Sequence, residues 1–315
     1  MIKIGIVGAG IIGIEHKKAI MKNSDCTIAA ICDLDIEKAK SLSEGTDAAI
    51  YTDYKEMCKN ESLDAVILNL PHFLHKDVTI YFLNHKIAVL TEKPMANTVE
   101  QCDEMAAAAK QNNVPFAIGH VQRYYACYRK LRELIRENKL GKLCQIIEVR
   151  NVDYVPGRPK WFLSKEQSGG GILMNYGAHT LDKVFYTTGL KVQSVAANGS
   201  NFLTSDNVET AAQLLVTLTG GVSAVFSYCG THVPSFYETN FYFTDGAAKV
   251  RDGIYLWIAK PGGDYEKVDL DYETSIFDLQ LKEFVKLLRG EESEIVTPEY
   301  GREIISVLQN AFGQF

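Results

Sequence analysis

The feature that most constrains the fold is a short apolar segment, Ile2–Val7, which runs directly into Gly8-Ala9-Gly10-Ile11-Ile12-Gly13. Three glycines at this spacing arise by chance in many chains, so their context decides what they mean. Here they separate a predicted strand from a predicted helix, Glu15–Lys22. The first glycine suits a tight turn, the second lets the backbone approach a pyrophosphate, and the third allows helix and strand to pack closely. We therefore expect a dinucleotide to be bound by Gly8, Gly10, Ile11, Ile12 and Gly13.

An acidic residue stands where such a site needs one. Asp33 follows the second predicted strand, Thr27–Cys32, about 20 positions beyond the glycines. Its carboxylate would accept hydrogen bonds from the adenosine ribose and repel a 2′-phosphate, which favours NAD over NADP as the cofactor. The alternative is that Asp33 or Asp35 only caps the next predicted helix, Ile36–Ser43.

The remainder of residues 1–120 alternates short apolar runs with helical patterns, which is typical of parallel strands joined by crossover helices. The further strands expected are Ala65–Leu68, Ala88–Leu90 and Phe116–Ile118, with helices at Lys76–Asn84 and Val99–Gln111. This region predicts an N-terminal Rossmann domain, a doubly wound parallel sheet of the α/β class.

Residues 121–315 show longer segments with β-rich composition, separated by Gly-containing turns such as Asp245-Gly246. They predict a second, α+β domain with an open, mostly antiparallel sheet. The strands expected are Leu143–Val149, Val192–Asn198, Glu209–Thr217, Val222–Tyr228, Tyr237–Phe243 and Ile254–Ile258; helices are expected at Tyr125–Asn138, Gly171–Thr188, Phe277–Leu288 and Tyr300–Phe312.

Composition excludes several classes of function. The net charge of −6 argues against nucleic acid as a partner, because phosphate binding needs a basic face. No segment approaches the ~20 apolar residues that span a bilayer, and no small-residue cleavage site follows the apolar N-terminal segment. The seven cysteines contain no C-x-x-C pair, so we expect reduced thiols and no metal site. Together these features predict a cytoplasmic protein without a membrane partner.

The first catalytic candidate is Lys93, in Glu92-Lys93-Pro94 directly after the strand Ala88–Leu90. Proline restricts the residue before it to extended conformations, so the direction of Lys93 is constrained. Ligands of open α/β sheets bind at the carboxyl ends of the strands, which is where this lysine lies. A lysine next to a nicotinamide ring could exchange a proton with a substrate hydroxyl. The alternative is a solvated pair of charges in a loop.

The second candidate is the segment that begins Gly169-Gly170-Gly171 and continues through Asn175, His179 and Asp182. If it is helical, these three polar residues are spaced i, i+4 and i+7 and form one stripe on an apolar helix. The glycines would leave room for a ligand at the helix start. His179 is a natural proton acceptor near neutral pH. A histidine satisfied within the core is the alternative.

Taken in order, these motifs resemble those of the glucose–fructose oxidoreductase, inositol dehydrogenase and MocA (Gfo/Idh/MocA) family of NAD(P)-dependent oxidoreductases. The resemblance covers nearly the whole chain. Besides the glycine loop and Glu92-Lys93-Pro94 it includes Gly119-His120-Val121-Gln122-Arg123, Lys160-Trp161-Phe162, the Gly-rich helix and the two closing helices.

The resemblance implies that a carbohydrate-like substrate binds between the two domains, that Lys93 and His179 exchange its proton, and that the open sheet forms a homodimer or homotetramer. It also places Leu70, Pro71, His75 and Glu92 at the cofactor. Residues expected at the substrate are Arg123, Tyr154, Arg158, Trp161, Asn175 and His179.

Two segments depart from the family pattern. Many members have aspartate where this chain has Asn175, and an amide can orient a hydroxyl but cannot take its proton. The usual Thr-Pro-Asn-x-x-His reads Leu70-Pro71-His72-Phe73-Leu74-His75, which removes a hydroxyl near the nicotinamide ribose. The hypothesis is reversible hydride transfer between NAD and a carbinol of a sugar, cyclitol or sugar derivative, with NAD-assisted glycoside hydrolysis and non-catalytic NAD sensing as alternatives.

Overall fold

The computed structural model describes residues 1–203, 207–232 and 234–315, and the chain divides into two compact units. The first unit contains Met1–Val121 and Thr274–Glu303, and the second contains Gln122–Glu273 and Ile304–Phe315. The sequence predicts two continuous domains that meet at residue 120. The units also change over near that residue, but residues 274–303 return to the first unit.

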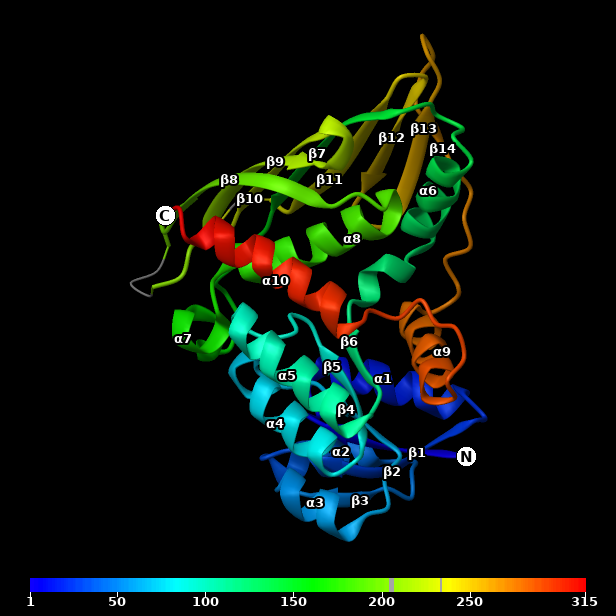
Figure 1. The fold of residues 1–315 in the computed structure, drawn as a ribbon, viewed down its shortest axis with the longest axis vertical. Coiled ribbons are helices and arrows are strands. Elements are labelled where there is room, and N and C mark those ends of the chain that lie inside the picture. The colour runs from blue at the N-terminus through cyan, green and yellow to red at the C-terminus, as the bar shows by residue number, and fades with distance from the viewer. Residues whose placement is uncertain (204–206, 233) are drawn as a thin grey trace. The chain divides into compact units, whose positions relative to one another are not determined.

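The first unit is built on a parallel sheet of six strands (Figure 1). The strand order is β3-β2-β1-β4-β5-β6, as in the Rossmann fold. The strands are β1 Ile2–Val7, β2 Cys26–Cys32, β3 Ala49–Tyr51, β4 Ala65–Leu68, β5 Ala88–Glu92 and β6 Phe116–Gly119. The helices are α1 Ile11–Lys22, α2 Ile36–Ser43, α3 Tyr54–Asn60, α4 His72–Asn84, α5 Val99–Asn112 and α9 Ile276–Leu288, with the start of α10 Pro298–Phe312.

Burial of both sheet faces explains why these strands are short and apolar. Every residue of β4 is buried, as is expected of a parallel strand covered by helices on both sides. Helix α9 packs against α1, where the ring of Phe277 meets that of His16 edge-on at 5.0 Å between centroids. This contact is one reason why residues 274–303 belong to the first unit.

The second unit contains an eight-stranded sheet in the order β14-β13-β12-β11-β7-β10-β9-β8. Among the described strand pairs of this sheet, only β7 and β10 are parallel, so the prediction of a mostly antiparallel sheet is confirmed. The strands are β7 Leu143–Asn151, β8 Val192–Ser200, β9 Ala211–Leu218, β10 Ser223–Cys229, β11 Phe236–Phe243, β12 Gly246–Arg251, β13 Tyr255–Ala259 and β14 Glu266–Lys267.

One face of this sheet is covered and the other is open. Along β9, residues alternate between buried and exposed, with Leu214 buried and Leu215 60% exposed. The buried face packs under α8 Ala178–Thr188, which is buried at every position from Ala178 to Thr187 (Figure 1). The remaining helical segments of this unit are the 3₁₀ turns Val121–Tyr124, Lys160–Leu163 and Thr219–Gly221, the π-helical turn Leu173–Gly177, and the helices α6 Ala126–Arg136 and α7 Lys165–Ser168.

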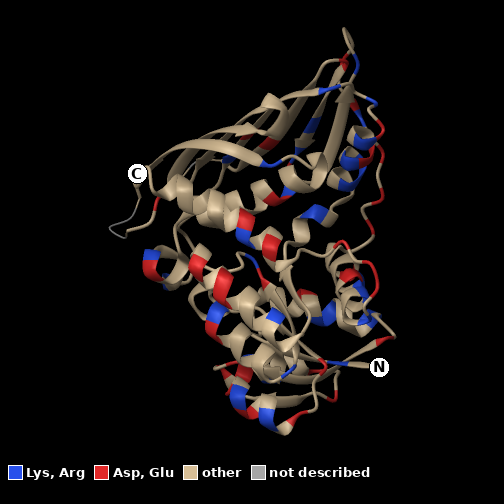
Figure 2. Cartoon of the chain, in the orientation of Figure 1, with Lys and Arg blue, Asp and Glu red and all other residues tan. Residues whose placement is uncertain are grey.

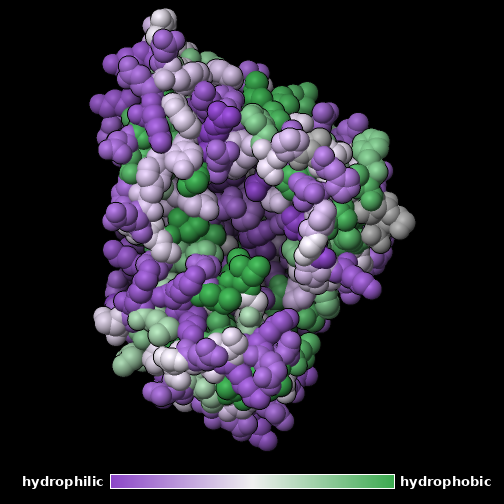
Figure 3. Space-filling view, turned by 180° about the vertical axis from the view of Figure 1, so that it is seen from behind, coloured by the Kyte–Doolittle hydropathy of each residue, from purple (hydrophilic) through white to green (hydrophobic). Residues whose placement is uncertain are grey.

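The surface of each unit mixes hydrophilic and hydrophobic side chains (Figure 3). Among the described residues, no helix has the length and apolar character needed to cross a membrane.

Candidate functional site

The glycine loop between β1 and α1 has the geometry that dinucleotide binding requires. Gly8 has φ +96°, and a Cβ there would lie 2.3 Å from the carbonyl oxygen of Asn69. A Cβ on Gly13 would lie 2.4 Å from the carbonyl oxygen of Gly8, so the third glycine lets helix and loop pack closely. A Cβ on Gly10 would meet nothing within 4 Å. The backbone at Gly10 is therefore open to a pyrophosphate, beside the first turn of α1 that carries Ile11 and Ile12.

Asp33 at the end of β2 is tied to this loop. Its Oδ2 atom accepts the backbone N–H of Ala9 at 2.7 Å, and its Oδ1 atom accepts that of Asp35 at 2.9 Å. Asp35 is the residue that caps α2, because its side chain accepts the N–H groups of Glu37 and Lys38. The two aspartates therefore have separate tasks, and Asp33 lies next to the glycines rather than at the helix cap.

We expect Asp33→Asn to weaken NADH binding by about 10-fold and to reduce discrimination against NADPH. The amide keeps an acceptor for the N–H of Ala9 but removes the negative charge that repels a 2′-phosphate. Fluorescence titrations with NADH and NADPH measure both effects. Asp35→Asn is the matched control, and an equal change in preference for that variant would contradict the role of Asp33.

The loop after β5 carries Glu92 and Lys93, and Glu92 is fixed from α1. Nε2 of His16 lies 3.0 Å from Oε1 of Glu92, and the histidine is buried. Oε2 of Glu92 accepts the backbone N–H of Lys93 at 3.3 Å. Glu92 is therefore not a freely solvated charge, since it connects His16 on α1 to the backbone of Lys93. Sequence reasoning missed His16, because nothing in its spacing from residue 92 indicates contact.

His75 joins the loops after β4 and β5. Its ring is fully buried, with Nδ1 2.8 Å from the carbonyl oxygen of Pro94 and Nε2 2.8 Å from that of Leu70. Burial lowers the pKa of His75, although both carbonyl contacts oppose this effect. Pro71 precedes α4, which begins at His72 rather than at Lys76 as predicted. The residues expected at the cofactor from these two loops thus form one connected group.

In the second unit, the glycine run serves packing within the chain. A Cβ on Gly171 would lie 2.0 Å from the carbonyl oxygen of Glu209, and one on Gly170 would lie 2.4 Å from the ring of Phe312. The Glu209 carboxylate accepts the N–H groups of Gly171 at 2.9 Å and Leu173 at 2.8 Å. Burial raises the pKa of Glu209. The space left by the glycines is filled by the protein itself, which corrects the expectation that a ligand approaches there.

Asn175 and His179 lie on consecutive helical segments with different geometry. Asn175 is within the π-helical turn Leu173–Gly177, and His179 is the second residue of α8. Each is 7% exposed. The prediction of a helix here is confirmed, but the π turn interrupts the regular i, i+4 spacing. Such turns are rare and occur frequently at functional sites.

Two residues expected at the substrate are buried in the second unit. Arg123 is 4% exposed, and its Nε atom donates to Oδ1 of Asp182 at 3.0 Å. Tyr154 is fully buried. Arg158 and Trp161 are only half-buried. The indole ring of Trp161 stacks on Phe162 at 3.9 Å between centroids. Of these four residues, Arg158 and Trp161 are therefore the two with exposed surface.

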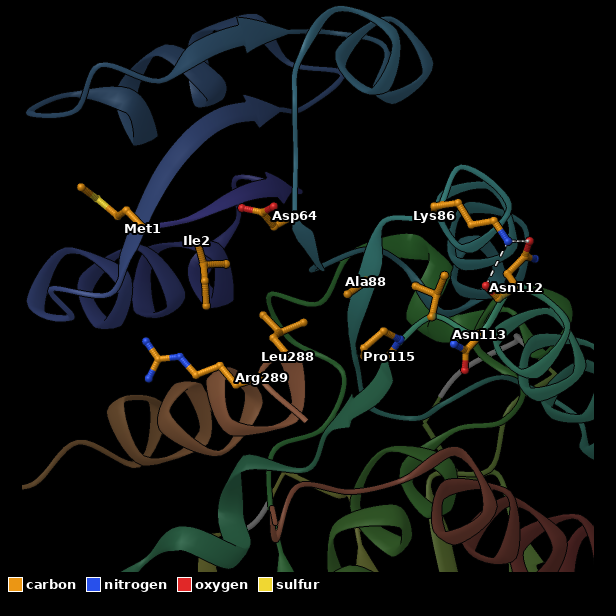
Figure 4. Close-up of a pocket in the computed structure, with 11 residues that line it drawn as sticks. Met1, Ile2, Asp64, Lys86, Ala88, Asn112, Asn113, Pro115, Leu288 and Arg289 are labelled. Carbon is orange, nitrogen blue, oxygen red and sulfur yellow. Dashed lines mark hydrogen bonds between the residues drawn. The ribbon is translucent and has the colours of Figure 1, made fainter. Parts of the chain in front are cut away.

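A depression of about 460 Å³ lies at the amino ends of the strands of the first unit, the ends opposite to the glycine loop and Lys93 (Figure 4). Ile2 and Ala88 line it at the starts of β1 and β5, and Lys86 donates to Asn112 at its edge. It contains none of the residues expected to bind cofactor or substrate.

Comparison with known proteins assigns both parts of the chain to one family. Residues 2–120 match a family model described as an oxidoreductase family with an NAD-binding Rossmann fold, and residues 128–249 match the GFO/IDH/MocA C-terminal domain. The chain belongs to the Gfo/Idh/MocA family, and its first unit contains an NAD-binding Rossmann domain.

The relatives differ in what they are described as doing. The chain is 30% identical over 198 residues to a 2,7-anhydro-N-acetylneuraminate hydratase of Mediterraneibacter gnavus, a match covering 62% of this chain and 52% of the relative. It is 24% identical over 314 residues to a myo-inositol 2-dehydrogenase of Thermotoga maritima, a match covering 95% of this chain and 92% of the relative.

The chain spans about half the length of several curated relatives. A solved aldose-aldose oxidoreductase from Caulobacter crescentus, complexed with glycerol, has a TM-score of 0.90 at 22% identity, covering 99% of this chain and 97% of that one.

Proposed function

We propose that the protein catalyses reversible, NAD-dependent oxidation of a secondary alcohol in a sugar, cyclitol or sugar derivative. NAD, when bound, accepts the hydride from the carbinol carbon or returns it. Lys93 and His179 exchange the hydroxyl proton, and Asn175 orients the substrate through its amide. Arg158 and Trp161 provide the substrate contacts.

The observation that carries this proposal is the connected group around Lys93. Glu92 is held by His16 on α1, and His75 contacts the carbonyl group of Pro94, the residue after Lys93. The loops expected to hold the cofactor and the lysine expected to transfer the proton thus lie at neighbouring strand ends, where ligands of open α/β sheets bind, and this supports the proposal. The relatives described as acting on inositol and aldoses support the substrate class.

An absorbance screen for reduced nicotinamide tests the proposal. NAD and NADP are each combined with neutral sugars, cyclitols, sugar acids and nucleotide sugars. We expect reduction of NAD with at least one alcohol substrate, and slower reduction of NADP because Asp33 repels the 2′-phosphate. Binding of NADH without turnover of any member of the panel would favour a non-catalytic NAD sensor instead.

A second candidate is a reaction without net redox change. The Mediterraneibacter gnavus relative is described as a hydratase, and addition of water involves no net oxidation or reduction. NAD-assisted glycoside hydrolysis belongs to the same chemical class. Product analysis by mass spectrometry, with catalytic NAD and no accumulation of NADH, separates this candidate from a dehydrogenase.

We also propose that two copies of the chain associate through the open face of the second sheet, as a homodimer or as half of a homotetramer. This face carries apolar side chains, including the 60% exposed Leu215 on β9 and the half-buried Ile147 and Val225 on β7 and β10. Burial of such a surface favours association. Light scattering after size-exclusion chromatography measures the molar mass of the protein in solution. A monomer at micromolar concentration would contradict the proposed association.

A further inference from the structure

Two arginines of the second unit surround one tyrosine, which lies close to Asn175 and His179 in the chain. Arg150 lies near the end of β7, Arg158 in the loop that follows, and Tyr176 within the π-helical turn. The guanidinium carbon of Arg150 is 3.7 Å from the centroid of the Tyr176 ring, and that of Arg158 is 5.8 Å away. Nη2 of Arg158 also donates to the hydroxyl of Tyr176 at 2.9 Å. Tyr176 adjoins Asn175 in the chain and precedes His179 by one turn.

The buried carboxylates of the second unit leave these two charges unbalanced. Among the described residues these carboxylates are Glu148, Asp182 and Glu209. Glu148 lies 3.8 Å from Nζ of Lys183, Asp182 pairs with Arg123, and Glu209 accepts backbone N–H groups. Charged positions are otherwise sparse along the sheet of this unit (Figure 2). In the part of the chain that the structure describes, neither Arg150 nor Arg158 forms an ion pair with a carboxylate.

The hydrogen-bonding capacity of the two guanidinium groups is also incompletely used. Arg158 donates through Nε to the carbonyl oxygen of Tyr154 and through Nη2 to Tyr176. The Nη1 atom of Arg150 is buried without a hydrogen-bond partner among the described residues. Aromatic rings cover the faces of both groups, with Tyr154 at 4.1 Å from Arg158 and Tyr237 at 4.6 Å from Arg150. Stacking fixes the planes of the guanidinium groups and leaves N–H donors at their edges.

We propose that the polyol substrate carries a carboxylate, which Arg150 and Arg158 bind beside Tyr176. Both arginines are partly exposed and form no ion pair with a described carboxylate, so an anionic ligand at their exposed edges would balance the two charges. The planar fork of a guanidinium matches the paired oxygens of a carboxylate, as it also can those of a phosphate, and the glucose 6-phosphate probe below distinguishes the two groups. The inference rests on the proposed function, because it assigns the substrate class of the site that contains Asn175 and His179.

The experiment compares matched probes on the full chain in the presence of NAD. Glucuronate and galacturonate carry a carboxylate, glucose and galactose are their neutral counterparts, and glucose 6-phosphate supplies a phosphate. Isothermal titration measures binding of each probe, and absorbance measures NAD reduction. The variants are Arg150→Gln, Arg158→Gln and Arg158→Lys. Arg251→Gln on the exposed side of β12 is the control that removes one positive charge elsewhere.

We expect the wild-type protein to bind a uronate at least ~10-fold more tightly than its neutral counterpart. Each Gln variant should lose roughly 10- to 100-fold of uronate affinity and a smaller factor of neutral-sugar affinity, so that the preference for the uronate falls. Arg158→Lys should recover only part of the loss, since an ammonium group lacks the fork. Arg251→Gln should behave as wild type. Because Arg158 is half-buried, its variants remain informative if Arg150→Gln does not fold.

Preference for neutral sugars, tighter binding of glucose 6-phosphate than of either uronate, or equal losses for acidic and neutral probes would each overturn this inference. The two proposals fail separately. If NAD is reduced with neutral polyols alone, the proposed function stands without the carboxylate site. If uronates bind in an arginine-dependent manner but no probe reduces NAD, the site stands and the dehydrogenase proposal does not.

Discussion

Replacement of Lys93 by methionine is expected to reduce turnover at least ~10²-fold while NADH binding is retained, because methionine preserves the apolar stem but cannot transfer a proton. The main chain at this position is anchored independently of the side-chain amine, since Glu92 accepts the N–H of Lys93 and is itself held by His16. The loop should therefore keep its conformation in Lys93→Met. Steady-state rates measure the first effect and NADH fluorescence the second.

Lys110→Met provides a control for this result. Lys110 is exposed on α5, and its loss should leave both turnover and NADH affinity unchanged. Turnover by Lys93→Met at the wild-type rate would exclude Lys93 as the acid–base group. Parallel loss of NADH binding would instead indicate that the lysine is needed for cofactor binding. A pH profile of the residual rate then shows whether His179 acts alone.

The second large effect is expected for Arg123→Leu, which should destabilise the second unit by about 3–5 kcal/mol. Removal of the guanidinium would leave the fully buried carboxylate of Asp182 without its cationic partner. An uncompensated charge in the interior is strongly unfavourable, whereas loss of both partners is far less so. Urea denaturation measures the free energy of unfolding.

The double variant with Asp182→Asn isolates the cause. It should recover most of the stability that Arg123→Leu loses, and Arg251→Leu, at an exposed position, should lose little. If Arg123→Leu instead raises KM at unchanged stability, Arg123 acts at the substrate, as the sequence predicts. The two outcomes separate a residue that holds α8 in place from one that touches the ligand.

Most helices and strands of the first unit could be predicted from the sequence. Ile36–Ser43 and Ala65–Leu68 have the predicted bounds, because apolar runs between turn residues dominate the pattern there. The strand Ala49–Tyr51 and the helix Tyr54–Asn60 were not predicted, since three and seven residues are too few to show a period. In the second unit β12 was missed, because Gly-Ala-Ala has little strand propensity and pairing with β11 and β13 determines its conformation.

The candidate site was predictable in its motifs but not in its supporting contacts. Glycine spacing, Asp33 and Lys93 are visible from local sequence. The partners His16 and Glu209 lie 76 and 38 residues from the atoms they contact, and no local pattern encodes such distances. The same limit explains why the sequence predicts space for a ligand at Gly170 and Gly171. Only the fold shows that Phe312 and Glu209 occupy that space.

The return of residues 274–303 to the first unit has a consequence for biosynthesis and for fragment design. A ribosome has translated the whole region 122–273 of the second unit before it makes Phe277, whose ring packs edge-on against His16. Synthesis of the first unit thus starts at the N-terminus and is completed only after most of the second unit has been made. A fragment that stops at residue 120 lacks α9 and leaves bare the side of α1 that holds His16, the residue that fixes Glu92.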